Sequence, residues 1–221
     1  MATKRLAATA ALLAILAAPA SAQLAGRATA VQPDALQAIG PVGQPVSVGD
    51  EILKQARVYT KQYGTMEIKL EDGTMLTVAP NASLVIDDYV FAGPSRPGRL
   101  ALSLARGAMR VASGRMPSEA VAINTPTATI GVRGTAFWLD AAPDAVRIWV
   151  TEGTVTAAPT GTAETYAFDA PAFATCSATG CERGDAPALP TVNPLGGGGS
   201  AGIGGAGEDL DERDDFHEGL F

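Results

Sequence analysis

The chain has 221 residues and a formal net charge of −7, and although 47% of it is hydrophobic, only 5% is aromatic. This length allows one core of ordinary size with tails, packed mainly by aliphatic side chains. The acidic balance argues against nucleic acid or anionic lipid as the main partner, so we expect no nucleic acid among its ligands.

Residues 1–22 have the pattern of a signal peptide. Lys4 and Arg5 give a basic start, residues 6–18 form an apolar run too short for a membrane span, and residues 20–22 read Ala-Ser-Ala, a small-x-small cleavage sequence. We expect cleavage after Ala22 and a mature protein that is periplasmic or secreted, without a stable membrane span. An uncleaved anchor is the alternative.

The first half of the mature chain predicts short strands. Residues 23–38 are expected to form an extended lead-in or a first strand, and the domain proper begins at residue 39. A strand then enters a turn at Gly49-Asp50. Apolar and charged residues alternate over 66–71, and Asp72-Gly73 is a strong hairpin signal before the return strand.

Residues 100–132 also predict short strands separated by turns. Leucines alternate with small residues over 100–105, and Arg106-Gly107 separates them from Met109 and Val111, which predicts another hairpin. Further on, Thr125-Pro126 ends a strand because proline donates no ladder hydrogen bond. Apolar alternation resumes at Ala128 and continues to Val132.

Gly134 is expected to form a bulge or a tight corner, because glycine tolerates backbone conformations that other residues avoid. We therefore expect Gly134→Val to damage folding more than Asp72→Ala or Glu152→Ala. Residues 135–139 and 146–155 then predict two paired strands. With turns at short intervals and no helical periodicity after residue 22, the chain is predicted to be all-β, either a β-sandwich or a rolled, solenoid-like stack of two antiparallel-rich sheets.

Several of these segments resemble the periplasmic FecR domain family. Its pattern pairs G-D and D-G-T-x-L with a later T-P-x-A, V-R-G-T-x-F and E-G-x-V. The corresponding residues here are Gly49-Asp50, Asp72-Gly73-Thr74-Met75-Leu76, Thr125-Pro126-Thr127-Ala128, Val132-Arg133-Gly134-Thr135-Ala136-Phe137 and Glu152-Gly153-Thr154-Val155. The resemblance favours the rolled stack and a FecR-like β domain over residues 39–157.

The family's best-known members pass a signal from an outer-membrane iron-siderophore receptor to a cytoplasmic sigma factor. They do so with a cytoplasmic segment and a membrane span ahead of this domain. We expect this chain to be a stand-alone form that lacks both, so transmembrane sigma regulation is not carried over from the resemblance. A role in envelope signalling related to those iron-siderophore regulators remains an alternative.

The C-terminal part divides by composition. Residues 158–183 are expected to be an extension with a cysteine loop, residues 184–207 a Pro/Gly-rich linker, and residues 208–221 a disordered acidic tail. Cys176 and Cys181 predict a local structural disulfide in an oxidising compartment, with a redox-active pair as the alternative.

The charged motif residues are interpreted mainly as structural. An arginine inside an apolar strand, such as Arg133, is expected to be held by backbone carbonyls or a buried carboxylate, with Glu152 as candidate partner or as a solvent-facing turn residue. Binding of an anionic ligand by Arg133 is the alternative. Turn chemistry explains Asp50 and Asp72.

Four aromatic residues are candidate partner contacts. Trp138 and Trp149 are expected on the face opposite the alternating apolar residues, where they either form a carbohydrate or protein contact or are covered as part of the core. Phe216 and Phe221 in the acidic tail would suit a docking motif, although a plain solubility segment is the preferred interpretation.

The sequence predicts a binding or scaffolding module of the cell envelope rather than an enzyme. Its one histidine, His217, allows neither a Ser-His-Asp set nor a metal cluster, and we expect no catalytic residue, metal or cofactor. A glycan hydrolase that uses Glu152 with Asp72 or Asp50 is the unfavoured alternative. The partner is expected to be a protein or a cell-envelope polysaccharide.

Overall fold

The computed structural model describes residues 23–190 and residue 192. Within these residues the elements follow in the order β1 (Leu24–Val31), β2 (Ala35–Ala38), β3 (Gly43–Pro45), β4 (Glu51–Leu53), β5 (Arg57–Thr60), β6 (Met66–Leu70), β7 (Met75–Val78), β8 (Ser83–Val90), β9 (Arg99–Ala112), the 3-10 helix η1 (Ser118–Ala120), β10 (Val121–Asn124), β11 (Ala128–Ala141), β12 (Val146–Pro159), β13 (Tyr166–Asp169), β14 (Ala172–Ser177) and β15 (Gly180–Arg183).

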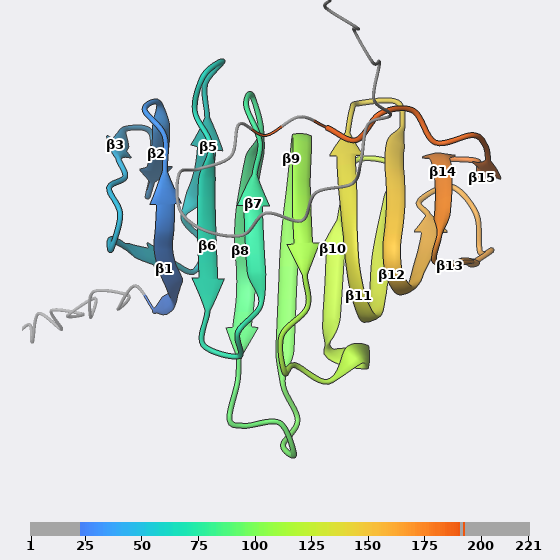
Figure 1. Ribbon diagram of the computed structural model, residues 1–221, viewed down its shortest axis with the longest axis horizontal. Coiled ribbons are helices and arrows are strands. Elements are labelled where there is room, and N and C mark those ends of the chain that lie inside the picture. The colour runs from blue at the N-terminus through green and yellow to red at the C-terminus, as the bar shows by residue number, and fades with distance from the viewer. Residues whose placement is uncertain (1–22, 191, 193–221) are drawn as a thin grey trace, which may run out of the picture.

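All of these strands belong to one mixed 15-stranded sheet that folds over on itself into two layers (Figure 1). Three strands of 14 residues, β9, β11 and β12, contribute one half to each layer. In β9, residues 99–106 pair with β8, whereas residues 107–112 pair with β11. Because long strands continue from one layer into the other, the predicted all-β rolled stack is confirmed.

The two layers are defined by these pairings. The first layer contains β2, β3, β5, β8, β10 and β13 with residues 99–106, 128–133 and 154–159 of the long strands. The second layer contains β1, β4, β6, β7, β14 and β15 with residues 107–112, 136–141 and 146–150. Among the described strands, only β9 and β10 pair in parallel.

Glycines with positive φ mark the places where the long strands change layer. The φ angles are 80° at Gly107, 59° at Gly134 and 71° at Gly153. The predicted corner at Gly134 is therefore confirmed. The predicted hairpin at Arg106-Gly107 is wrong, because β9 continues through Gly107 and bends into the second layer instead of turning back on itself.

The core lies between the layers and is built by the inward-facing residues that alternate along the strands. One row of paired residues crosses the first layer from Ile86 through Leu102 and Ile123 to Ile130. A matching row crosses the second layer and includes Phe137, the largest fully buried side chain. The alternation read from the sequence thus gives the correct inner face for both layers.

The sheet extends beyond the segment that the motifs cover. Strand β1 pairs with both β6 and β4, so residues 23–38 contain the first strands of the sheet and not only a lead-in. At the other end, β13 and β14 pair with β12. Ala25 and Cys176 both belong to the one large core cluster, so residues 24–183 form a single folded unit.

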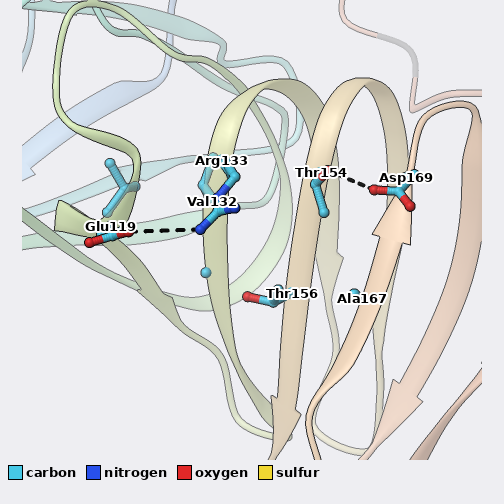
Figure 2. A pocket seen from close by; sticks show the side chains of 9 residues that line it. Glu119, Val132, Arg133, Thr154, Thr156, Ala167 and Asp169 are labelled. Carbon is cyan, nitrogen blue, oxygen red and sulfur yellow. Dashed lines mark hydrogen bonds and ion pairs between the residues drawn. The ribbon is translucent and has the colours of Figure 1, made fainter.

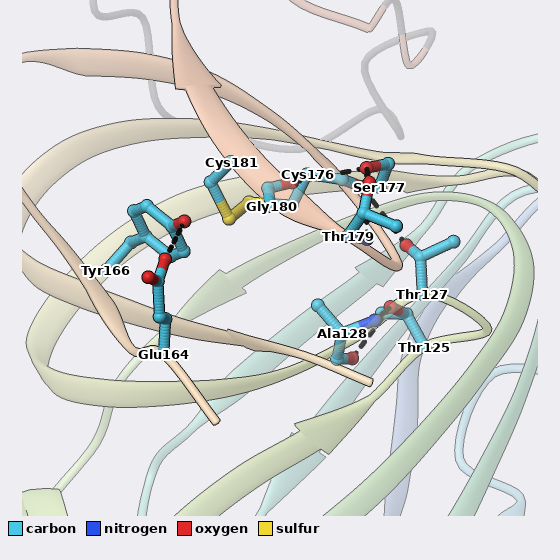
Figure 3. Close-up of a disulfide and its surroundings, with 10 residues drawn as sticks. All are labelled: Thr125, Thr127, Ala128, Glu164, Tyr166, Cys176, Ser177, Thr179, Gly180 and Cys181. Carbon is cyan, nitrogen blue, oxygen red and sulfur yellow. Dashed lines mark hydrogen bonds between the residues drawn. A yellow bond between two sulfur atoms is a disulfide. The ribbon is translucent and has the colours of Figure 1, made fainter. Parts of the chain in front are cut away.

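Cys176 and Cys181 are joined by a disulfide across the β14–β15 hairpin (Figure 3). Cys176 is fully buried, and the hydroxyl of Thr127 donates a hydrogen bond to its carbonyl at 3.1 Å. The bridge therefore lies in the hairpin that ends the stack, next to the β10–β11 turn. This placement is that of a local structural crosslink.

Free-thiol labelling of the unreduced, denatured protein is expected to find no reactive thiol. Reduction should lower the free energy of unfolding by about 2 kcal/mol, because chain-entropy arithmetic gives small loops a small effect. Equilibrium urea denaturation with and without reductant measures this difference. Two labelled thiols in the unreduced protein would contradict the bridge.

Candidate functional site

The early motif Asp72-Gly73-Thr74 forms a buried hydrogen-bonded hub. The Asp72 carboxylate is fully buried and accepts hydrogen bonds from the Thr74 hydroxyl at 2.5 Å, the Tyr89 hydroxyl at 3.1 Å and the Met116 amide at 3.2 Å. It also accepts one from the Thr74 amide at 3.3 Å. Asp72 therefore ties the β6–β7 turn to β8 and to the segment after β9.

Tyr89 is the residue of this hub that the sequence did not reveal. Burial raises the pKa of its hydroxyl well above the ordinary value, and the nearby Asp72 carboxylate adds to that rise. The hydroxyl consequently stays protonated and donates to Asp72, while it accepts from the Asp72 amide at 2.9 Å. Because the Asp72 carboxylate is buried and its hydrogen bonds join parts of the fold, we interpret Asp72 as a structural residue.

Gly49-Asp50 forms a similar turn at the surface. Gly49 has a φ of 94°, and the exposed Asp50 carboxylate accepts a hydrogen bond from the Ser47 amide at 2.8 Å. This is the turn chemistry that the sequence indicated.

The late motif also serves the fold at most of its positions. Thr125 and Pro126 lie in the β10–β11 turn, where the Thr125 hydroxyl donates to the Ala128 carbonyl at 2.8 Å. Val132, Thr135 and Phe137 are buried.

Gly134 and Gly153 complete the structural part of the late motif, because they form the adjoining corners of β11 and β12. A Cβ placed on Gly153 would lie 2.3 Å from the Gly134 carbonyl oxygen. The two corners are therefore packed backbone against backbone.

Arg133 is an exception in this motif, because its side chain is not held in the way that the sequence predicted. Its side chain is 73% exposed, and its nearest acidic group is Glu119, whose carboxylate lies 3.7 Å from the guanidinium. Arg133 lies on the outer face of β11, because Val132 before it takes the inward position. The guanidinium is therefore held neither by a buried carboxylate nor by backbone carbonyls, and it is available to a ligand.

Glu152 is an exposed residue at the corner of β12. This agrees with its interpretation as a solvent-facing turn residue and not with its interpretation as the partner of Arg133. The acidic partner of Arg133 comes instead from η1, which precedes β10. No sequence pattern indicated this partner, since Glu119 lies in a segment without strand periodicity. Its exposed fraction of 89% makes the Arg133–Glu119 pair a weak one.

A groove of about 550 Å³ runs along the outer face of the first layer beside Arg133. Figure 2 shows Glu119 and Arg133 at one side and Asp169 at the other, with Thr154 and Thr156 between them. The remaining lining residues are Val121, Gly131, Val132 and Ala167. Because the middle of this surface carries only small side chains, the strands β11, β12 and β13 form an open floor in which the threonines alternate with apolar residues and glycine.

The groove offers hydrogen-bonding groups of both kinds. Arg133 supplies donors, Glu119 and Asp169 supply acceptors, and the Thr154 hydroxyl already donates to Asp169 at 2.7 Å. This arrangement suits a polar, extended ligand such as a peptide or a polysaccharide. Within the described residues there is no cluster of histidine, cysteine and acidic side chains able to hold a metal ion.

Trp138 and Trp149 lie opposite each other on the outer face of the second layer, as the register predicted. Their exposed fractions are only 6% and 4%, because Phe173 and the chain after β15 cover them. They are therefore not open to a partner in this conformation. Phe216 and Phe221 lie outside the described residues, as do the predicted signal peptide and acidic tail.

Comparison with known proteins agrees with the motif. The family model described as FecR protein matches residues 56–156. No curated protein matches the chain. Within the described residues, no helix has the length and apolar character needed to span a bilayer.

Two crystal structures of a candidate anti-sigma factor from Parabacteroides distasonis are similar in structure. Their TM-scores are 0.47 and 0.46 at 14% and 13% sequence identity, and each alignment covers 58% of this chain and 59% of the other. The chain thus spans less than two thirds of the length of these proteins. The family match thus places a FecR domain at residues 56–156, the segment that holds most of the motif residues described above.

Proposed function

We propose that this FecR-domain protein is a non-enzymatic binding module of the cell envelope, and that it holds a protein or polysaccharide partner in the groove beside Arg133. One observation carries the proposal. Arg133 and Glu152 are the charged residues of the late motif and both are exposed, but of the two only Arg133 lines the groove. Its neighbours in the motif serve the fold, because Val132, Thr135 and Phe137 are buried and Gly134 forms a corner of β11.

An exported location is part of the proposal. The basic start, the short apolar run and the Ala-Ser-Ala sequence support secretion, and the disulfide between Cys176 and Cys181 suits an oxidising compartment. Partners in the envelope, such as receptor domains or polysaccharides, would then be within reach of the groove.

The carboxylates that could support hydrolysis do not suit that chemistry. Asp72 is fully buried and saturated with hydrogen bonds, so it cannot contact a glycan. Asp50 precedes β4 at one end of the strand order, whereas Glu152 lies in β12 toward the other end. A general acid and base must flank the same bond, which supports binding over catalysis.

Envelope signalling is the second candidate, and the FecR-domain match supports it. The two candidates differ in their effect on transcription. A signalling component would change the expression of a defined gene set when deleted, and Arg133→Ala would reproduce that change. A passive module would leave transcription unchanged while still losing its partner.

Replacing Arg133 by alanine is expected to weaken partner binding by about tenfold or more, because a hydrogen bond to a charged group contributes about 1.5–3 kcal/mol. Envelope extracts passed over the immobilised wild-type and variant proteins, with quantitative mass spectrometry and glycan analysis of the eluates, measure the change. The melting temperature should not change, since the side chain is exposed.

Arg99→Ala is the matched control. Arg99 is 71% exposed and pairs with Asp88 at 3.3 Å, so it resembles Arg133 in exposure and in having a surface ion pair. It does not line the groove. If both variants retained the same partners as the wild type, the groove would not be the binding site.

A further inference from the structure

A row of aromatic side chains crosses the outer face of the second layer, on the side away from the core. Trp138 on β11 faces Trp149 on β12, and Phe173 on β14 continues the row, with 5.0 Å between the Trp149 and Phe173 ring centroids. Ala79 and Ala108 pack against the same cluster. We call these five residues the aromatic shelf.

The chain after β15 crosses this shelf as an extended segment, which we call the strap (residues 184–192; residue 191 is not among the described ones). The Trp149 indole N–H donates to the Pro187 carbonyl at 3.1 Å, and the Gly184 amide donates to the Phe173 carbonyl at 3.2 Å. Val192 packs against the shelf. In Figure 1 the strap runs from β15 back across the ends of β14, β12 and β11.

The strap buries the tryptophans but is itself held weakly. Residues 184–189 are exposed and form neither helix nor strand. Two hydrogen bonds of the described residues attach it, one of them to a side chain. Segments with few contacts and exposed backbone open at low free-energy cost, so the strap is suited to release.

The contact has the chemistry of proline-rich peptide recognition. Pro187 and Pro190 have P-x-x-P spacing, and a polyproline II helix of three residues per turn brings such residues to one side. Aromatic-lined grooves bind these preformed segments. Tryptophan offers a large apolar ring and one N–H donor. A hydrogen bond from this N–H to a peptide carbonyl next to a proline therefore fixes the position of the bound segment on the ring.

We propose that the aromatic shelf is a binding site for a proline-rich, P-x-x-P segment of a partner protein, and that the strap occupies this site in cis until such a segment replaces it. The shelf lies on the second layer and the Arg133 groove on the first, so this site does not depend on the function proposed for the groove. The strap already makes one such contact in the structure, the hydrogen bond from the Trp149 indole to the Pro187 carbonyl.

Intrinsic fluorescence reports on this site alone, because the chain has two tryptophans and both are in the shelf. The probe is a synthetic peptide with the sequence of residues 184–192. It is titrated into the full chain and into a strap-release variant of the full chain that carries Pro187→Gly, Pro190→Gly and Val192→Ser.

The release variant is expected to show red-shifted emission, and the peptide should return it toward the wild-type spectrum. The wild type should bind the peptide about tenfold or more weakly than the variant, because the cis strap occupies the site for most of the time. A peptide with both prolines replaced by glycine should bind neither protein at the same concentrations.

Trp149→Phe in the release variant is the positioning control. It keeps an aromatic ring but removes the indole donor, so peptide affinity should fall about tenfold, in line with the loss of one hydrogen bond, as read from Trp138 emission. A folded release variant whose emission does not respond to saturating peptide would overturn the proposal. Equal binding of the proline-free peptide would also overturn it.

Should the release variant fail to fold, a protease site inserted after Gly184 keeps the test decisive. The wild-type chain is folded first, then cut, and exchange of the nicked strap with fluorescently labelled peptide is followed. Exchange of the nicked strap for the labelled peptide would show that the strap is a replaceable ligand of the shelf. A nicked strap that neither dissociates on dilution nor exchanges would show that it is a permanent part of the fold.

Discussion

Asp72→Ala is expected to lower the free energy of unfolding by about 4 kcal/mol, since it leaves several buried donors without an acceptor at about 1–3 kcal/mol each. The Tyr89 hydroxyl, the Thr74 amide and hydroxyl and the Met116 amide all lose their acceptor. These groups come from three separate parts of the chain, so the loss would loosen the junction of β7, β8 and the segment after β9.

Equilibrium urea denaturation compares this variant with Asp50→Ala. Asp50 is also a turn aspartate, but it is exposed and accepts one hydrogen bond from the Ser47 amide. Its replacement should have a much smaller effect. Equal denaturation midpoints for the two variants would show that the buried hub does not stabilise the fold as its geometry implies.

Gly153→Ala is expected to lower the free energy of unfolding by about 3 kcal/mol, because strain and overpacking act together at about 1–3 kcal/mol each. Its φ of 71° is unfavourable for any side chain. The added Cβ would lie 2.3 Å from the Gly134 carbonyl oxygen and 2.8 Å from that of Arg133, and backbone atoms cannot move aside cheaply.

Gly134→Ala separates strain from overpacking. Gly134 has a φ of 59°, yet a Cβ there would meet no atom within 4 Å. Its cost should therefore be limited to the backbone term of about 1–2 kcal/mol. Urea denaturation of both variants tests the difference, and a larger loss for Gly134→Ala than for Gly153→Ala would contradict the packing of the two corners.

The buried hub leads us to expect a larger effect for Asp72→Ala than the sequence indicated. Gly134→Val was expected to damage folding more than Asp72→Ala, because the motif pattern shows that a glycine is present but not how much space surrounds it. Aspartate beside glycine was attributed to turn chemistry alone. The Tyr89 hydroxyl and the Met116 amide reach Asp72 from positions 17 and 44 residues away, a distance that local patterns do not report.

The strands themselves could be predicted because alternation is a local property. Residues 66–70, 128–132 and 146–150 all bury the face that the sequence indicated. The path of β9 could not be predicted in the same way. A glycine with positive φ serves both a hairpin turn and a bend between layers, and only the pairing of residues 107–112 with β7 and β11 distinguishes the two.

The candidate site was predicted only in part. Arg133 was recognised, but its exposed position depends on β11 placing Val132 inward at the corner. Glu119, Thr154 and Asp169 come from three other elements and carry no common motif. The sequence also did not predict that the chain after β15 covers the two tryptophans, because residues 184–190 have no periodicity that would assign them to a face of the sheet.

Site-specific photo-crosslinking from the groove shows whether a partner binds there. A photoreactive phenylalanine at Thr156, in the floor of the groove, is compared with one at Thr29, an exposed position on β1, in cells that express the full chain. We expect a discrete crosslinked partner from position 156 that Arg133→Ala removes and Arg99→Ala retains. Crosslinks that are identical from both positions, or that persist in Arg133→Ala, would contradict it.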